Sequence, residues 1–167
     1  GIPIVYVSHE IDEVVRLADT MVIIDNGLTV AAGPVENIMS RLDLRPLTGR
    51  YEAGAVISVT VAGHDKTYGL TELSFFGGRL WVPALNQAMG HKMRMRIRAR
   101  DVSLSLSPPT DSSFLNIVEG SVLEIRREAG PQTDILVDVG TPLIARVTRK
   151  SVAAMRLQPG TKVFALI

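Results

Sequence analysis

The chain has 167 residues, of which 46% are hydrophobic and only 5% aromatic, so it can bury an aliphatic core of one or two small domains. The charged residues balance to a formal +1, which argues against a strongly basic nucleic-acid binder. The sequence holds no cysteine, which excludes disulfides and thiolate metal sites. No apolar run reaches the roughly 18–20 residues that a membrane-spanning helix needs.

The first 45 residues predict a small α/β segment. The run Ile4–Val7 is continuously apolar, which is typical of a strand buried on both faces of a parallel sheet. Ser8 is placed to cap a following helix, whose first turn is acidic and whose apolar residues recur at helical spacing. The run Met21–Ile24 predicts a second buried strand.

The pair Asn26-Gly27 then predicts a tight hairpin, because both residues tolerate positive φ. The returning strand spans residues 28–32, and Pro34 opens a short helix. Regular periodicity is lost after this helix, so we place a linker at residues 46–53.

From Gly54 the pattern is β throughout, with short strand-like runs separated by glycine or proline. We expect a first unit at residues 54–107, a proline-rich linker at 108–112 and a second unit at 113–167. The second unit repeats the order of strands and glycines of the first; for example, Gly160-Thr161-Lys162-Val163 echoes Gly90-His91-Lys92-Met93. The predicted fold is therefore mainly β, with two tandem OB-like barrels preceded by an α/β segment. Within the second unit, residues 151–157 predict a short helix.

His9 is the first candidate functional residue. It follows the first predicted strand, where open α/β sheets bind ligands, and a neutral imidazole there can donate a hydrogen bond to a phosphate. The alternative is a histidine packed at a strand end without a role. The string from Val7-Ser8-His9-Glu10 through Asp25-Asn26-Gly27 to Gly33-Pro34 resembles the closing part of an ABC transporter ATPase domain.

This resemblance implies that residues 1–45 are the end of a nucleotide-binding domain and that His9 is its γ-phosphate switch. The glycine loop that cradles phosphates, the catalytic carboxylate and the signature loop of the family are not in this sequence. Phosphoryl transfer depends on such parts for positioning and charge stabilisation. We therefore expect ATP binding and hydrolysis of the parent protein, and no hydrolysis by residues 1–167 alone.

The segment Lys92–Arg100 alternates basic and apolar residues, so a strand would present its charge on one side. Such a face can bind an anion or a nucleic acid. It can equally well face solvent or pair with carboxylates of a neighbouring element. Few aromatic residues are available to stack bases, which argues against a single-strand-binding OB-fold.

A cluster of hydrogen-bond donors marks the second unit. Ser113 and Asn116 precede its first strand, and Thr148, Lys150 and Ser151 lie at a step from strand to helix. Hydroxyls, an amide and backbone N–H groups at a helix start form a natural oxyanion site. The alternative is that Thr148 or Ser151 simply caps the helix.

The pattern of this unit resembles the molybdate-binding TOBE or Mop module. The matching elements are Ser113-x-x-Asn116, Gly120-Ser121-Val122, Thr148-x-x-Ser151 and Leu157-x-Pro159-Gly160. The preceding unit, with its Arg98-Ala99-Arg100-Asp101-Val102 run, resembles a companion TOBE unit. Two such units behind an ABC segment resemble the ATP-binding subunits of bacterial molybdate importers.

The resemblance implies a regulatory domain that binds molybdate or tungstate and holds two ATPase subunits apart when the oxyanion is plentiful. It also implies a homodimer, a membrane permease as partner, no nucleic acid, and a peripheral position on the cytoplasmic face of the inner membrane. The sequence departs from the module in two places. Leu115 stands where the module has an arginine, and the sequence ends at Ile167, before the position of the module's lysine. We therefore do not expect strong oxyanion binding by this chain alone.

Two other functions remain open. The first is a structural dimerisation module in an importer of another solute, such as a sugar, in which the hydroxyl pairs are helix caps. The second is a nucleic-acid-binding OB protein that uses the arginines of segment 92–100.

Overall fold

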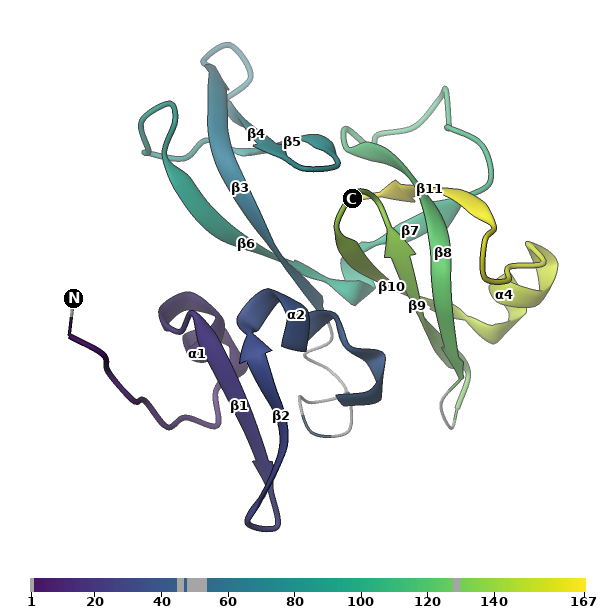
Figure 1. Cartoon of the computed structure of the whole chain (residues 1–167). Helices are drawn as coiled ribbons and strands as arrows, with labels where there is room; N and C mark the ends of the chain where they lie inside the picture. Colours follow the sequence, from purple (N-terminus) through teal and green to yellow (C-terminus); the bar gives the residue numbers. More distant parts are fainter. Residues whose placement is uncertain (1, 45–46, 48–53, 128–129) are drawn as a thin grey trace.

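The computed structural model describes residues 2–44, 47, 54–127 and 130–167 (Figure 1). The structure contains a four-stranded and a five-stranded antiparallel sheet, with a small N-terminal α/β segment packed against them. This confirms the mainly β fold. The predicted linker at 46–53 lies, except for Leu47, outside the described residues.

The prediction of a buried strand at Ile4–Val7 is wrong. Residues 2–10 form no helix or strand, and Ile4 and Val5 are 84% and 95% exposed. Figure 1 shows this stretch leading away from the rest of the chain. An apolar run of this kind is stable as a strand only between two neighbours, and none of the described strands pairs with it.

The N-terminal segment then forms helix α1 (Ile11–Leu17), strands β1 (Thr20–Asp25) and β2 (Leu28–Pro34), helix α2 (Val35–Ser40) and the 3₁₀ turn η1 (Leu42–Leu44). The Asn26-Gly27 hairpin is confirmed, with φ of 48° and 78°. Among the described strands β1 pairs only with β2, so Met21 is buried while Val22 and Ile24 are exposed. The expected burial of both faces is therefore wrong.

Ser8 does not cap α1, whose N-cap residue is Glu10. The Ser8 hydroxyl instead accepts a hydrogen bond from the Glu10 backbone N–H (3.0 Å) and donates one to the Glu13 carboxylate (2.9 Å). Ser8 therefore stabilises the turn that precedes α1.

The first sheet follows the order β5-β4-β3-β6, formed by β3 (Gly54–Asp65), β4 (Leu70–Phe75), β5 (Gly78–Pro83) and β6 (Lys92–Arg98). The second sheet follows the order β10-β9-β8-β11-β7, formed by β7 (Ser103–Ser105), β8 (Ile117–Arg127), β9 (Gln132–Asp138), β10 (Pro142–Thr148) and β11 (Lys162–Leu166). The predicted helix of the second unit is α4 (Arg149–Ala154).

Strand β7 lies in the second sheet although it precedes the proline-rich linker. The 3₁₀ turn η2 (Ala99–Asp101) leads the chain from β6 across to β7, which pairs antiparallel with β11. Sheet membership therefore does not follow the expected division at 107–108, because the first repeat donates its last strand to the second unit.

The predicted repeat is visible in the hydrogen bonding. Val61 N–H donates to the His91 carbonyl at 2.9 Å, and Val122 N–H donates to the Thr161 carbonyl at the same distance. The reciprocal bonds from Gly90 and Gly160 N–H to the carbonyls of Val61 and Val122 are both 2.8 Å. Each of the two long strands also shifts register directly after its valine. β6 therefore corresponds to β11.

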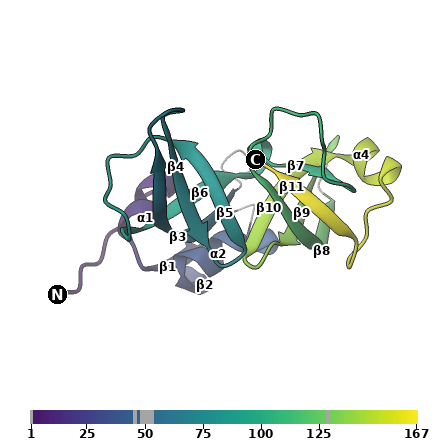
Figure 2. The same cartoon turned by 90° about the horizontal axis from the view of Figure 1, so that it is seen from above.

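The two units share one hydrophobic core, which includes Ile57 and Leu73 from the first sheet and Ile135 and Val163 from the second. Figure 2 shows the units side by side. Their β4–β5 and β9–β10 turns meet so closely that a Cβ built on Gly77 would lie 1.6 Å from the Val139 carbonyl oxygen.

The N-terminal segment packs on both units. Val56 of β3 belongs to the hydrophobic cluster around Val35 of α2, and Leu42 of η1 packs with Ala99 and Ile144. Leu42 is 1% exposed. The α/β segment is thus held at the point where η2 crosses between the sheets.

Candidate functional site

The hydroxyls of Thr148 and Ser151 lie together at the start of α4. Thr148 is the N-cap, and its Oγ1 accepts a hydrogen bond from the Ser151 N–H (3.0 Å). The two hydroxyl oxygens are 2.8 Å apart, and either can be the donor. One bond between two hydroxyls uses one O–H, so the pair keeps a second O–H for an external acceptor. Thr148 and Lys150 are exposed, and Ser151 is half-buried.

The side chain of Asn116 lies in a different environment from the Thr148–Ser151 hydroxyl pair. Its Oδ1 accepts a hydrogen bond from the Trp81 N–H (2.6 Å), and its Nδ2 donates one to the Trp81 carbonyl (2.9 Å). Its own carbonyl accepts a bond from Ile167 N–H (3.0 Å). The side chain therefore ties the start of β8 to β5 of the first unit. Ser113 and Leu115 beside it are exposed.

The five predicted oxyanion ligands form two groups rather than one. Asn116 lies beside Ile167, at the C-terminal end marked between the two units, whereas α4 lies at the outer end of the second unit in both Figure 1 and Figure 2. Asn116 thus lies beside the first unit, with Ser113 three residues before it in the sequence, and Thr148, Lys150 and Ser151 lie away from the first unit. One copy of the chain does not bring the two groups together.

His9 is exposed in the irregular stretch before α1. Its neighbourhood is organised by Glu13, whose carboxylate accepts hydrogen bonds from the Tyr6 hydroxyl (2.8 Å) and the Ser8 hydroxyl (2.9 Å). The bond from Tyr6, followed by that from Ser8, lowers the pKa of the Glu13 carboxyl, and the same carboxylate raises the pKa of the Tyr6 hydroxyl.

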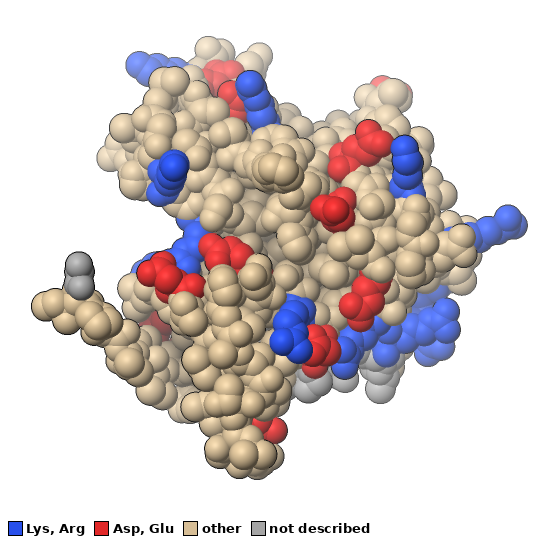
Figure 3. Space-filling model, in the orientation of Figure 1, with Lys and Arg blue, Asp and Glu red and all other residues tan. Residues whose placement is uncertain are grey.

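The basic face of β6 is partly covered by the chain's own carboxylates. Arg96 pairs with Asp12 of α1, and Arg94 donates to the Ala18 carbonyl and lies 3.5 Å from the Asp19 carboxylate. Figure 3 shows acidic and basic side chains adjoining where α1 meets β6. Burial, followed by the nearby charges of Arg98 and Arg100, lowers the pKa of Arg96. Among the alternatives for this segment, carboxylate pairing therefore holds for Arg94 and Arg96.

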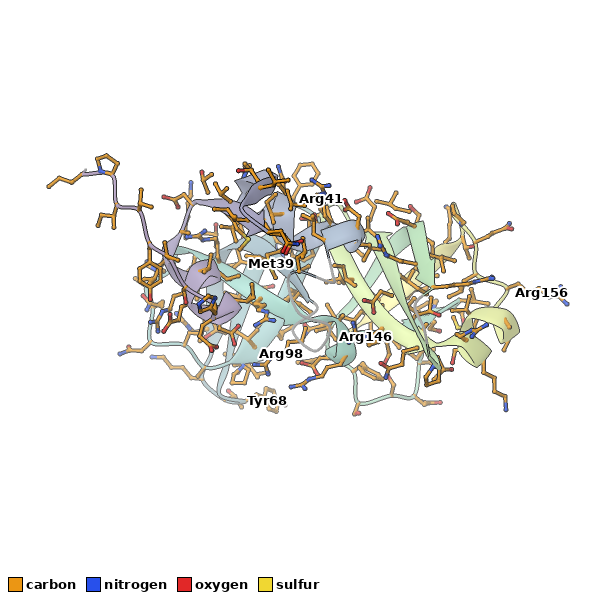
Figure 4. All side chains as sticks on the ribbon, turned by 90° about the horizontal axis from the view of Figure 1, so that it is seen from below. Met39, Arg41, Tyr68, Arg98, Arg146 and Arg156 are labelled. Carbon is orange, nitrogen blue, oxygen red and sulfur yellow. The ribbon has the colours of Figure 1, made fainter. Side chains whose placement is uncertain are left out.

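Sequence reasoning missed a buried ion pair between Asp134 and Arg146. The guanidinium bonds both carboxylate oxygens, at 2.7 and 2.8 Å, and the side chains are 3% and 10% exposed. The two residues face each other across β9 and β10. Figure 4 shows Arg146 and Arg98 on either side of the junction between the units. The sequence signal for this ion pair is a pair of opposite charges at facing strand positions. It can be recognised only when the register between β9 and β10 is known.

A second polar network surrounds His64. A carbonyl only accepts, so the 2.9 Å contact with the Gln87 carbonyl places the proton on Nε2, and Nδ1 then accepts from the Thr71 hydroxyl (3.0 Å). Thr71 Oγ1 in turn accepts from Leu85 N–H (2.9 Å). The chain of bonds satisfies a fully buried Thr71 and fixes the loop after β5.

The described ranges contain neither a cluster of metal-ligating side chains nor a helix that could span a membrane. Across residues 2–44, 47, 54–127 and 130–167, histidine, aspartate and glutamate side chains nowhere gather in threes as metal ligands. Over the same ranges, no helix has the length and apolar character needed to cross a membrane.

Comparison with known proteins finds relatives of the second unit and of the chain as a whole. Residues 112–167 match the TOBE domain model. The chain is 42% identical over 168 residues to the molybdenum import ATP-binding protein ModC of Paramagnetospirillum magneticum, covering 100% of this chain and 46% of that protein. The corresponding protein of Mesorhizobium japonicum is 43% identical over 167 residues, covering 99% of this chain and 45% of that protein.

A solved structure of the cytoplasmic molybdate-binding protein ModG with molybdate bound has a similar fold, with a TM-score of 0.56 and 24% identity, covering 67% of this chain and 88% of that one. The chain spans slightly less than half the length of the two ModC relatives. It is homologous over its whole length to part of the ModC molybdenum import ATP-binding proteins, and its residues 112–167 form a TOBE domain.

Proposed function

We propose that this chain is the regulatory part of the ATPase subunit that energises molybdate import, and that its TOBE region senses the oxyanion and forms a dimer. The observation that carries the proposal is the similarity of this chain, over its own whole length, to part of the ModC proteins, together with the Thr148–Ser151 hydroxyl pair inside the matched TOBE region. The likeness in fold to ModG, itself a molybdate-binding protein, supports it.

The chemistry of the site suits a tetrahedral dianion, which requires convergent donors and positive potential rather than acid–base groups. Thr148 and Ser151 offer a free O–H, and Lys150 adds a positive charge beside them. Ser113 and Asn116 lie at the other end of the unit. We propose that they complete the site from a second copy, so that molybdate or tungstate binding and dimer formation are coupled.

The remaining assignments follow from the similarity to the longer ModC relatives. We propose that the two sheets are tandem OB-like units and that residues 1–45 close a nucleotide-binding domain. ATP would bind in that domain, with His9 as the γ-phosphate switch. A membrane permease would be the partner, and the protein would lie on the cytoplasmic face of the inner membrane.

Calorimetry with molybdate, tungstate and sulfate tests the sensing function, on residues 1–167 and on a version extended beyond Ile167. We expect molybdate and tungstate to bind the extended version, and the Thr148→Val/Ser151→Ala variant to lose this binding. Thr161→Val is the matched control, because Thr161 Oγ1 also accepts a backbone N–H, that of Gln158 at 3.0 Å. Absence of binding, or equal binding of sulfate, overturns the molybdate assignment.

The competing function is a structural dimerisation module for an importer of another solute, such as a sugar. Two observations favour it: Thr148 caps α4, and the amide of Asn116 is already bonded to Trp81. This alternative predicts a dimer whose mass in gel filtration is the same with and without molybdate. A nucleic-acid-binding role predicts a salt-dependent shift of a labelled oligonucleotide. We do not expect this shift, because Arg96 pairs with Asp12 of α1 and Arg94 lies 3.5 Å from the Asp19 carboxylate.

A further inference from the structure

The outer face of the first sheet is partly covered by the N-terminal segment. On β6, Arg94 and Arg96 face Ser58 and Val56 of β3, and all four residues contact this segment. Val56 belongs to a hydrophobic cluster formed with α1, α2 and the hairpin, and the Ser58 hydroxyl donates to the Glu36 carboxylate of α2 at 3.4 Å. Successive strand residues point to opposite faces, so the methionines of β6 pack against the core instead.

The two arginines hold α1 at its two ends. Arg96 pairs with Asp12 in the first turn of the helix. Arg94 donates to the carbonyl of Ala18, the C-cap residue, and lies 3.5 Å from the Asp19 carboxylate. The last carbonyls of a helix have no partner inside it and carry partial negative charge, so a guanidinium stabilises that end. The helix is therefore fixed at both ends on one strand.

Helix α1 depends on these contacts, because it has only seven residues and its N-cap residue, Glu10, makes no side-chain capping bond. Isolated helices shorter than about 12–15 residues are marginal in water. The side chains of Arg94 and Arg96 are 22% and 10% exposed, whereas those of Asp19 and Asp12 are 100% and 59% exposed. Salt screens charges that reach the solvent, so these contacts should weaken as ionic strength rises.

The N-terminal segment has a second anchor on the other unit. Leu42 of η1 packs with Ala99 of η2 and Ile144 of β10, and each of these side chains is 1% exposed or less. Ala99 directly follows Arg98, the last residue of β6. The strand that holds α1 therefore continues into the contact that holds η1, and both β units fix the segment.

We propose that Arg94 and Arg96 are positioning residues, through which the first unit fixes the placement of α1 relative to both β units. α1 begins at Ile11, two residues after His9, so the same contacts restrict where the chain can carry that histidine. The pairs on β6 are then the route by which a movement between the two units reaches the N-terminal segment. The role of His9 rests on the proposed function, whereas the placement of α1 does not.

The first test measures where α1 lies. The sequence contains no cysteine, so Arg16→Cys on α1 and Lys162→Cys on β11, both at exposed positions, provide two unique sites for spin labels. Double electron–electron resonance between the labels should give a single narrow distance distribution. Arg94→Met/Arg96→Met keeps the length of the side chains but removes both charges, and it should lose this single distribution. An unchanged distribution in that variant overturns the proposal.

Two further variants serve as controls for this measurement. Arg98 lies on the same face of β6 and is exposed, and its guanidinium makes no hydrogen bond or ion pair with the described residues. Arg98→Met should therefore leave the distribution unchanged, and a change as large as that of the double variant overturns the proposal. Arg94→Lys/Arg96→Lys keeps both charges and should keep the single distribution. If lysine acts like methionine, the role assigned to charge is wrong.

The second test follows the amides of α1 by hydrogen exchange. Their protection should fall by about tenfold or more in Arg94→Met/Arg96→Met, while the protection of the β11 amides stays the same and shows that the β units remain folded. If α1 protection does not fall, the proposal is overturned. Neither test uses an oxyanion or a nucleotide, so a chain that binds no molybdate can still confirm the placement of α1.

Salt gives the same experiment a second readout. Raising the ionic strength from about 0.1 M to about 1 M shortens the Debye length from about 10 Å to about 3 Å. Protection of α1 should then fall in the unchanged chain and stay constant in Arg94→Met/Arg96→Met. Protection that falls in the variant but ignores salt in the unchanged chain assigns the contact to packing of the arginine stems, and it overturns the role of charge.

Discussion

The side-chain amide of Asn116 occupies both backbone hydrogen-bonding groups of Trp81, at 2.6 Å from N–H to Oδ1 and 2.9 Å from Nδ2 to the carbonyl. An asparagine side chain thereby acts as a short extra strand against β5, and it joins the second unit to the first. The residue that sequence reasoning assigned to an oxyanion therefore has a structural role within one chain, which any ligand role in an assembly must accommodate.

Replacing Asn116 with alanine should destabilise the junction between the units. The change leaves the Trp81 N–H and carbonyl without partners, and losses of this kind cost about 1–3 kcal/mol for each buried group. Urea unfolding followed by Trp81 fluorescence measures the effect. Asn86→Ala, at an exposed position, is the control and should change stability little. An unfolding midpoint equal to that of the unchanged chain would contradict the role of the Asn116 side chain in joining the two units.

The buried pair of Asp134 and Arg146 gives a second prediction. Arg146→Ala leaves a carboxylate that is 3% exposed without its bidentate partner, and breaking such a pair costs about 3–5 kcal/mol. The double variant Asp134→Leu/Arg146→Met removes both charges and should recover most of the loss, because well-packed apolar replacements of buried pairs are often neutral. Chemical unfolding of the three proteins checks this. If the double variant is as unstable as Arg146→Ala, the loss comes from removing the ion pair itself and not from leaving the Asp134 carboxylate buried without Arg146.

The features that sequence predicted best are local ones. The Asn26-Gly27 turn and the helix after Pro34 depend on neighbouring residues, and they appear where expected. The prediction of a buried strand at Ile4–Val7 failed because this apolar pattern is typical of a strand between two neighbours. Whether such neighbours exist depends on the surrounding sheet and not on the run itself.

The prediction of a single oxyanion site within one copy of the chain failed for the same reason, because it also depended on long-range strand pairing. Ser113-x-x-Asn116 and Thr148-x-x-Ser151 belong to one repeat, which made a single site look natural. Strand β8 and helix α4 direct them to opposite ends of the unit, and β7 enters from the other repeat. Which strands exchange between units depends on long-range pairing and cannot be read from spacing alone.

Thr148→Ala should destabilise α4, because it removes the N-cap bond to Ser151 N–H; such losses are typically about 0.5–2 kcal/mol. Thr148→Ser keeps the hydroxyl and should keep both stability and any oxyanion affinity. Thermal unfolding with and without molybdate separates the two roles. If Thr148→Ala lowers stability but leaves stabilisation by molybdate unchanged, the hydroxyl is a cap and not a ligand.

The hydrogen bond between Tyr6 and Glu13 should be lost at both ends of the pH range. The hydrogen bond from Tyr6 holds the pKa of Glu13 below its ordinary value, so the stabilising contact is complete above that ordinary value and is lost as pH falls through the lowered pKa. The raised pKa of Tyr6 means that the contact is also lost at high pH, as the hydroxyl ionises.

Tyr6→Phe should therefore raise the pKa of Glu13 towards its ordinary value, measured by carbon NMR titration of the carboxyl group. Ser8→Ala should raise it less, because the bond from Tyr6 is the larger cause. An unchanged Glu13 titration in Tyr6→Phe would show that the stretch before α1 does not hold this arrangement in solution.

Gly77→Ala tests how closely the two units must approach. The added Cβ would lie 1.6 Å from the Val139 carbonyl oxygen, which is a backbone atom and cannot rotate away, and 2.6 Å from the Phe75 ring. The β4–β5 turn must therefore separate from the β9–β10 turn, which opens the shared core, and a loss of about 1–3 kcal/mol is expected for such overpacking. Gly63→Ala is the matched control, since its Cβ would meet only the Glu72 carboxylate at 3.6 Å. Because Asn116 also joins the units, Gly77→Ala and Asn116→Ala should be non-additive in a double-mutant cycle. Strict additivity would show that the contact between the β4–β5 and β9–β10 turns and the hydrogen bonds of the Asn116 amide stabilise the junction independently.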